Sequence, residues 1–244
     1  MTRDTKVNLS DVEELFTSTV SFDCLSPTES PFVIFVTGVS GSGKSTIIAK
    51  LKGNFFKIQP DNYRKLHPKI KDFKSKLGRN EAYKKTGNYS FEFAKVLRNH
   101  AIESRLNVIF EATFSKIETA QSLIQPFLEC GYRVFVVKLP INIDLSIERN
   151  IKRYKEKQTQ EHTIPRMTSR ENIELMASNY QNTLDELSKL NINIIDPVEL
   201  NALLDKYTDD ELELLHQLEN NLVATKTHDQ VMENLRKALH LDEK

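Results

Sequence analysis

The feature that most constrains the fold is a cluster of glycines near the start of the chain. Three of the seven glycines lie within the six residues from Gly38 to Gly43, and Lys44, Ser45 and Thr46 follow directly. Glycines let a loop wrap so that successive backbone N–H groups and the start of a following helix point at one phosphate chain. In such a loop the lysine reaches the β- and γ-phosphates and the serine hydroxyl binds Mg²⁺, so the pattern predicts a site for ATP or GTP with Mg²⁺. The predicted nucleotide-binding residues are Gly38, Ser40, Gly41, Ser42, Gly43, Lys44, Ser45 and Thr46.

Around this loop, between residues 31 and 196, short β-branched or aromatic runs alternate with longer amphipathic runs. The short runs are continuously apolar, as expected for strands buried on both faces of a parallel sheet. Their alternation with helices predicts an α/β fold, with a parallel sheet and helices on both faces. The predicted strands are Phe32–Val36, Phe55–Gln59, Asn107–Glu111, Arg133–Leu139 and Ile192–Ile195. The predicted helices cover residues 44–52, 90–104, 116–130, 143–156 and 169–188.

Length and charge predict one large domain with appendages. The 244 residues hold 34 basic and 34 acidic side chains, but residues 1–30 carry two basic and six acidic groups and residues 200–244 carry five and ten. The middle is therefore positively charged, which indicates a negatively charged ligand. We predict an N-terminal helical extension and linker over residues 1–30, a P-loop domain over 31–199 and a C-terminal helical extension over 200–244.

Capping-box spacing predicts where several helices begin. One box opens a short N-terminal helix at about residues 11–18, two open helices of the α/β region, and two open helices of the C-terminal extension. The boxes are Ser10 with Glu13, Ser115 with Glu118, Thr168 with Glu171, Thr208 with Glu211, and Thr227 with Gln230.

The cysteines and the absence of long apolar runs bear on the compartment. Neither Cys24 nor Cys130 has a nearby second thiol or paired histidine for a disulfide scaffold or a zinc site, which favours a reducing compartment. The first residues are polar where a signal peptide needs an apolar core, and no run of about 18 apolar residues occurs. The sequence predicts a cytoplasmic protein without a membrane segment.

Carboxylates follow the second and third predicted strands, at the sheet edge where open α/β sheets bind ligands. Asp61 follows the second strand, and a carboxylate that faces the γ-phosphate is the usual base for an acceptor hydroxyl. Arg64 follows so closely that a plain salt bridge is the alternative. Glu111 follows a buried strand, and Thr113 points to the same side if the chain stays extended. These two are interpreted as contacts to the acceptor or the metal, with a structural pair as the alternative.

Phosphoryl transfer also needs positive charge on the moving phosphate. The helix predicted at 143–156 is basic at its end, with Arg153 among its cations, and a polar loop leads on to Arg166. This pattern suits a lid that closes on ATP and supplies arginines, although cations also stabilise a helix C-terminus. The segment 57–85 holds ten basic and three acidic residues, and is either a platform for an anionic acceptor or a solvated face.

Together, three segments resemble the zeta-toxin family of bacterial P-loop kinases. The segments are Gly38-Val-Ser-Gly-Ser-Gly-Lys-Ser45, Gln59-Pro-Asp-Asn-Tyr-Arg-Lys-Leu-His-Pro68 and Glu111-Ala-Thr113, and Arg153-Tyr154 with Arg166 extends the match over about residues 31–190. The resemblance implies a P-loop kinase-like fold. It also implies phosphorylation of the 3′-hydroxyl of UDP-N-acetylglucosamine or a related nucleotide sugar with ATP and Mg²⁺. Many members are toxins silenced by a small protein antitoxin.

The resemblance also implies roles for single residues. Lys44 and Ser45 hold ATP and Mg²⁺, and the catalytic residues are Asp61 as base with Lys44, Arg153 and Arg166 on the phosphates. The substrate-binding residues are Arg64, Glu111 and Thr113. The chain departs from the family in having Gln59 where many members have an acidic residue, and Ala112 where they have glycine. Two alternatives stay open: a kinase for another anionic acceptor, such as a nucleotide or a polynucleotide 5′ end, and an ATP-dependent switch.

Overall fold

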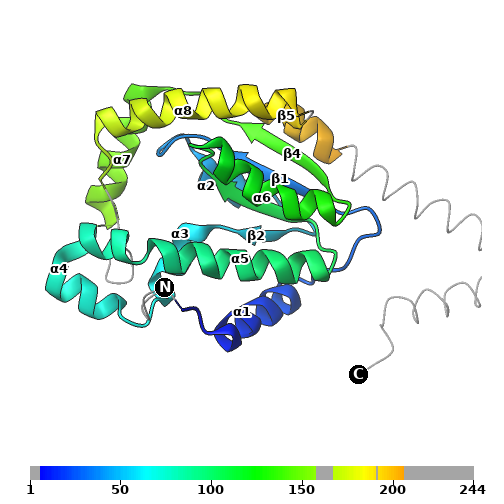
Figure 1. Cartoon of the computed structure of the whole chain (residues 1–244), viewed down its shortest axis with the longest axis horizontal. Helices are drawn as coiled ribbons and strands as arrows, with labels where there is room; N and C mark the ends of the chain where they lie inside the picture. Colours follow the sequence, from blue (N-terminus) through cyan, green and yellow to red (C-terminus); the bar gives the residue numbers. More distant parts are fainter. Residues whose placement is uncertain (1–5, 158–166, 191, 206–244) are drawn as a thin grey trace, which may run out of the picture. The chain divides into compact units, whose positions relative to one another are not determined.

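The computed structural model describes residues 6–157, 167–190 and 192–205 (Figure 1). The chain divides into two compact units, residues 1–196 and 197–244. In the second unit, the described residues 197–205 are helical. The helices predicted to open at Thr208 and Thr227 lie outside the described residues, and the domain boundaries predicted from composition stay predictions.

The first unit holds a five-stranded sheet in the order β2-β3-β1-β4-β5, and every pairing is parallel. The strands are β1 (Phe32–Thr37), β2 (Phe56–Ile58), β3 (Val108–Ala112), β4 (Arg133–Lys138) and β5 (Asn193–Ile195). All five predicted strands are confirmed, each end within one residue. The central strand β1 is buried along its whole length, which explains its unbroken apolar sequence.

Helices cover both faces of this sheet, as predicted. They are α1 (Leu9–Phe22), α2 (Lys44–Lys50), α3 (Pro60–Tyr63), the short 3₁₀ helix η2 (Arg64–Leu66), α4 (Ile70–Lys85), α5 (Gly87–Glu103), α6 (Ile117–Glu129), α7 (Ile143–Lys157) and α8 (Arg170–Lys189). Val33 and Phe35 of β1 belong to the main core with α5 and α6. Ile34 and Val36 alternate to the other face, and α2 packs against β1 and β3.

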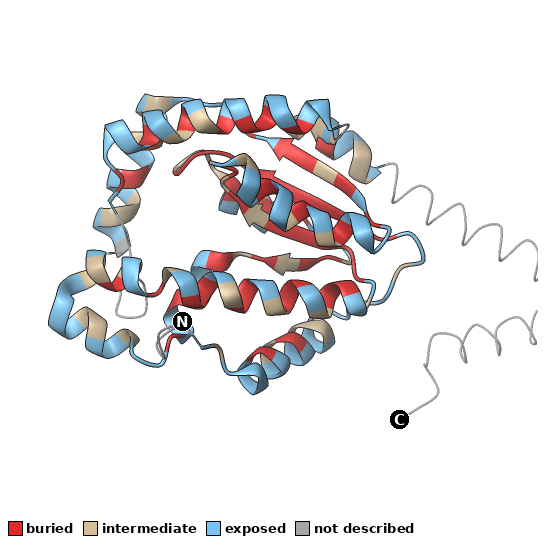
Figure 2. Ribbon diagram, in the orientation of Figure 1, coloured by how far each residue is buried: buried red, intermediate tan, exposed pale blue. Residues whose placement is uncertain are grey.

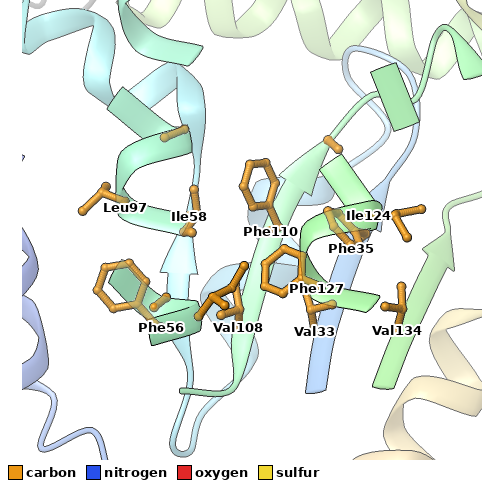
Figure 3. Close-up of a cluster of buried hydrophobic side chains, with 14 of the residues drawn as sticks. Val33, Phe35, Phe56, Ile58, Leu97, Val108, Phe110, Ile124, Phe127 and Val134 are labelled. Carbon is orange, nitrogen blue, oxygen red and sulfur yellow. The ribbon is translucent and has the colours of Figure 1, made fainter. Parts of the chain in front are cut away.

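The main core lies between the sheet and the helices α5 and α6, and its side chains are apolar and mostly aromatic or β-branched (Figure 3). Phe127 of α6 packs edge-on against Phe35, with ring centroids 5.7 Å apart. The N-terminal helix α1 joins the same core, because Val12 and Phe16 are buried there and Phe16 lies 5.1 Å from the ring of Phe56. In Figure 2 the buried residues of α5 form a stripe along the helix, as its amphipathic sequence requires.

The sequence analysis did not predict α3, η2 or α4, which lie in the basic segment 57–85. Helix α4 buries Ala82 alone, so it has no apolar stripe to mark it as a helix. It is also kinked at Gly78, whose φ of 76° lies in the left-handed region that glycine tolerates best. The basic segment is therefore mainly helical, and most of its lysines are exposed.

The predicted capping boxes are wrong at three described helices. Helix α1 is capped by Asn8, whose side chain accepts a hydrogen bond from the Ser10 N–H. Helix α6 begins after Lys116 without a side-chain cap, so Ser115 does not serve this role. Helix α8 is capped by Ser169, one residue later than predicted. Neighbouring Ser, Thr and Asn residues all favour the N-cap, so sequence spacing does not choose among them.

Membrane crossing can be tested on the described helices. Within residues 6–157, 167–190 and 192–205, the structure has no helix with the length and apolar character that a membrane span needs.

The core packing predicts a large effect of truncating Phe127. We expect Phe127→Ala to lower the free energy of unfolding by about 3–5 kcal/mol, because it removes a fully buried ring and leaves a cavity against Phe35. The matched control is Phe22→Ala at the end of α1, where the residue is 88% exposed and the expected change is below about 0.5 kcal/mol. Urea unfolding followed by circular dichroism measures both. Equal losses in the two variants would contradict the assigned core.

Candidate functional site

The glycine-rich loop runs from the end of β1 to the start of α2, as the motif requires. Gly38, Gly41 and Gly43 have φ values of 148°, 87° and 103°, so the loop uses backbone that other residues rarely adopt. A Cβ at Gly38 would lie 2.7 Å from Ser42 Oγ. The buried Ser42 hydroxyl has no hydrogen-bond partner among the described residues, which fits a loop shaped to receive an anion.

The strand that leads into the loop is fixed by a buried polar contact. Thr37 Oγ1 donates to the carbonyl of Val137 at 2.9 Å and lies 2.8 Å from the Tyr180 hydroxyl of α8. Burial raises the pKa of Tyr180 to about 12, so its phenol stays protonated at neutral pH. Helix α8 is thereby joined to β1 one residue before Gly38.

Helix α7 holds the loop from the outside through Asn150. This side chain is 1% exposed; its Nδ2 donates to the carbonyls of Ser40 (3.0 Å) and Ser146 (2.7 Å), and its Oδ1 accepts from Ser40 Oγ at 2.9 Å. The sequence analysis missed Asn150. A polar residue in a highly charged helix carries no sequence signal of burial, and only its spacing of three residues from Arg153 places it on the same helix face.

Lys44 and Ser45 open helix α2. Lys44 is buried, and its Nζ donates to the carbonyls of Gly38 (2.8 Å) and Val39 (3.0 Å), so the ammonium group lies inside the loop. Ser45 Oγ donates to the Glu111 carboxylate, with a distance of 3.2 Å to Oε2. The structure therefore brings the residue predicted to bind Mg²⁺ next to a carboxylate from the neighbouring strand.

Glu111 lies near the end of β3 and has a second partner. Gln59, which follows β2, donates from Nε2 to Glu111 Oε2 at 2.7 Å. Parallel pairing of Ile58 with Phe110 puts these two residues side by side at the sheet edge. Gln59 therefore takes up a hydrogen-bonding position beside the carboxylate, where many members of the family that the sequence resembles have an acidic residue.

Asp61, in the single turn of α3, forms the ion pair that was the alternative to its base role. Arg64 Nε lies 2.7 Å from Asp61 Oδ1. The Tyr83 hydroxyl of α4 also donates to Asp61, at 3.1 Å from Oδ1 and 3.2 Å from Oδ2. The Asp61 side chain is 63% exposed, whereas that of Arg64 is 7% exposed. Asp61 thus combines an ion pair with an accessible carboxylate.

Two arginines of α7 reach the loop. Arg153 Nη2 donates to Asn150 Oδ1 (2.7 Å) and to Ser40 Oγ (3.3 Å). Arg149 Nη1 donates to the carbonyls of Gly41 (3.3 Å) and Ser42 (3.4 Å). Arg149 was noted in the basic end of the helix but was not among the predicted site residues. Arg166 lies outside the described residues.

A cavity of about 970 Å³ at the carboxyl ends of the strands connects these groups. Its wall includes the loop residues Lys44 and Ser45, and also Asp61, Glu111 and Arg153. The other predicted residues on its wall are Ser40, Gly41, Gly43, Thr46, Arg64 and Thr113. Gly38 and Ser42 belong to the loop but not to the wall. The wall also holds Gln59, Asn62, Tyr83, Phe91, Arg149 and Met176, none of which was predicted as a site residue.

The donor atoms at the loop fit a nucleotide with Mg²⁺. The Ser45 hydroxyl and the Glu111 carboxylate are hard oxygen ligands within hydrogen-bonding distance of each other. Mg²⁺ commonly binds through one or two such protein groups together with phosphate oxygens. The described residues contain no cluster of three or more His, Cys, Asp or Glu side chains that would hold a metal by itself.

The phosphate-binding loop between β1 and α2 of a parallel sheet defines the class of the protein as a P-loop protein with a kinase-like α/β fold. The family follows from sequence. The zeta toxin family profile matches residues 17–209, and the chain belongs to this family. A comparison with curated proteins finds no match.

Solved structures show the same fold. One comes from the PezAT chromosomal toxin–antitoxin system of Streptococcus pneumoniae; it is 18% identical, with a TM-score of 0.65 over 80% of this chain and 78% of that chain. A putative kinase from Chloroflexus aurantiacus is 16% identical, with a TM-score of 0.45 over 62% of this chain and 80% of that one. The AvrRxo1-ORF1:-ORF2 complex with ATP is 15% identical, with a TM-score of 0.46 over 72% and 57%.

The contacts of Asn150 predict that it stabilises the loop. We expect Asn150→Ala to lower the free energy of unfolding by about 1–3 kcal/mol, since the buried Ser40 hydroxyl and carbonyl lose their partner. The matched control is Asn182→Ala on the exposed face of α8, with an expected change below about 0.5 kcal/mol. Denaturant unfolding of both variants measures the difference. An Asn150 variant as stable as the control would contradict this role.

Proposed function

We propose that the protein is a kinase that transfers the γ-phosphate of ATP to a hydroxyl of a nucleotide sugar, UDP-N-acetylglucosamine or a close relative. The observation that carries the proposal is that the phosphate-binding loop and Asp61 line one cavity. Transfer to a hydroxyl requires a phosphate-binding group and a base within reach of the same acceptor. Membership of the zeta toxin family supports a phosphotransferase and the nucleotide-sugar acceptor.

The phosphates of ATP bind to the loop N–H groups and to Lys44. Ser45 and Glu111 would hold Mg²⁺, which when bound supplies positive charge beside the β- and γ-phosphates. The contact of Glu111 with Ser45 and Gln59 supports a role on the metal side of the cavity. For Glu111 this favours the metal among the roles that the sequence left open.

Asp61 takes the proton of the acceptor hydroxyl. The hydroxyl oxygen bonds to the γ-phosphorus while the bond from that phosphorus to the ADP oxygen breaks. Lys44 and Arg153 stabilise the charge on the phosphate during transfer, and Arg166 has the same proposed role by resemblance. The position of Arg153 at Ser40 supports this assignment, since it brings a guanidinium group to the outer side of the loop.

The acceptor is proposed to bind on the side of the cavity away from the loop. Thr113 lines this cavity and is the predicted residue best suited to bind a sugar hydroxyl. Arg64, also predicted to bind substrate, is buried and pairs with Asp61 through Nε, which supports a role in orienting the base. The proposed partner of the protein, in addition to its substrates, is a small protein antitoxin, as is common in the family.

A polynucleotide acceptor would need the basic segment 57–85 as a platform. Three of its cations have local partners: Arg64 binds Asp61, Lys57 donates to the Leu51 carbonyl, and Lys84 pairs with Glu81. An ATP-dependent switch would need no base, so the accessible Asp61 carboxylate in the cavity favours transfer. The nucleotide sugar is therefore preferred over both alternatives.

The proposed base role of Asp61 predicts the kinetics of a nearly isosteric variant. We expect Asp61→Asn to lower kcat by roughly 10²- to 10⁴-fold with almost unchanged ATP affinity, because the amide cannot accept the proton. The control is Asp72→Asn, an exposed carboxylate in the first turn of α4, which should keep the wild-type kcat. Steady-state kinetics with the phosphorylated acceptor identified by mass provide the measurement. A wild-type rate in Asp61→Asn would return Asp61 to the plain salt bridge.

The acceptor class predicts a shallow dependence on salt. With labelled ATP and a panel of nucleotide sugars, nucleotides and oligonucleotides, we expect label on UDP-N-acetylglucosamine or a relative, with a modest change of KM between low and moderate salt. A single-stranded polynucleotide would give a log-log slope of about 0.7 per contacted phosphate. Lys44→Ala should abolish transfer, and Lys50→Ala, at the exposed end of α2, should not. Labelling of oligonucleotide 5′ ends alone would favour the polynucleotide kinase.

A further inference from the structure

Tyr83 contacts the proposed base and its arginine partner through three different groups. Its hydroxyl donates to Asp61, 3.1 Å from Oδ1 and 3.2 Å from Oδ2. Its ring lies beneath the Arg64 guanidinium, with Cζ 3.6 Å from the ring centroid. Its carbonyl accepts from Arg64 Nη1 at 2.6 Å. The contact joins α4 to α3, two elements that are 22 residues apart at this point of the sequence.

Asp61 needs such a contact because little else in its own element restrains it. Helix α3 has four residues, and the Asp61 side chain is 63% exposed. An exposed carboxylate on a single turn has rotamers that point away from the cavity. A base works only within hydrogen-bond reach of the proton that it takes, so a carboxylate held in one direction is more effective than a freely rotating one.

Arg64 is the other donor to Asp61, and it too depends on Tyr83. Its side chain is 7% exposed and lies between the Tyr83 ring and the start of α5, where a Cβ at Gly87 would be 3.4 Å from Nη1. A guanidinium group that stacks on an aromatic ring and donates to a carbonyl has few alternative positions. Tyr83 therefore orients Asp61 both directly and through Arg64.

We infer that Tyr83 is a positioning residue for phosphoryl transfer, which holds the Asp61 carboxylate toward the acceptor hydroxyl. This inference rests on the proposed base role of Asp61. Tyr83 lines the same cavity as Asp61, so its hydroxyl lies where the acceptor is expected to bind. Its role is in kcat and not in the affinity for ATP, because none of its described contacts is to the phosphate-binding loop.

The test is a double-mutant cycle with Tyr83→Phe and Asp61→Asn. Tyr83→Phe keeps the ring beneath Arg64 and removes only the hydroxyl. We expect it to lower kcat roughly ten- to hundredfold, the factor that a hydrogen bond to a charged group supplies, with unchanged KM for ATP. In the Asp61→Asn background the same substitution should cost almost nothing, since the base on which it acts is already lost.

The matched control is Tyr132→Phe, which removes a hydroxyl that donates to the carbonyls of Ala101 and Leu106. Tyr132 does not line the cavity, so this control should lower the unfolding temperature and leave kcat unchanged. A wild-type kcat in Tyr83→Phe, or an equal loss in both Asp61 backgrounds, would overturn the inference while the kinase proposal stands. A wild-type chain that phosphorylates no acceptor would overturn both.

Discussion

The close approach of helix α7 to the phosphate-binding loop is the constraint on which the rest of the site depends. A Cβ at Gly41 would lie 2.5 Å from the Ser146 carbonyl, so the helix backbone reaches the loop only because this position is glycine. Buried Asn150 then fixes the two together. Because α7 also carries Arg149 and Arg153, the contact that shapes the loop is the one that brings positive charge to it.

Parallel strand pairing performs the second step of assembly. The register of β2 with β3 places Gln59 beside Glu111, although 52 residues separate them, and the amide donates to the carboxylate at 2.7 Å. Ser45 reaches the same carboxylate from the start of α2. A second carboxylate at position 59 would repel Glu111 unless a cation lay between them, whereas glutamine holds it by a hydrogen bond. This chain therefore positions its metal-side carboxylate without a second negative charge.

The sequence predicted the strands and the loop well because both have strong local signals. Continuous apolar runs such as Phe32–Val36 arise from burial on both faces of the sheet, and the glycine pattern has one backbone solution. Helix α4 could not be predicted in the same way, since it buries Ala82 alone. The roles of Tyr83 and Asn150 were missed because they depend on contacts across 22 and 110 residues, which no local pattern records.

The net positive charge of the middle of the chain has a different meaning in the folded protein than in the sequence. Of the ten basic residues in segment 57–85, Arg64 and Lys65 are the two that line the cavity, and Arg64 pairs with Asp61. The cations at the loop come instead from α2 and α7. The remaining wall beyond Asp61 includes Asn62, Tyr83, Phe91 and Thr113, which are uncharged. Uncharged hydrogen-bonding groups and an exposed ring match the hydroxyls and the base of a nucleotide sugar better than the closely spaced phosphates of a polynucleotide.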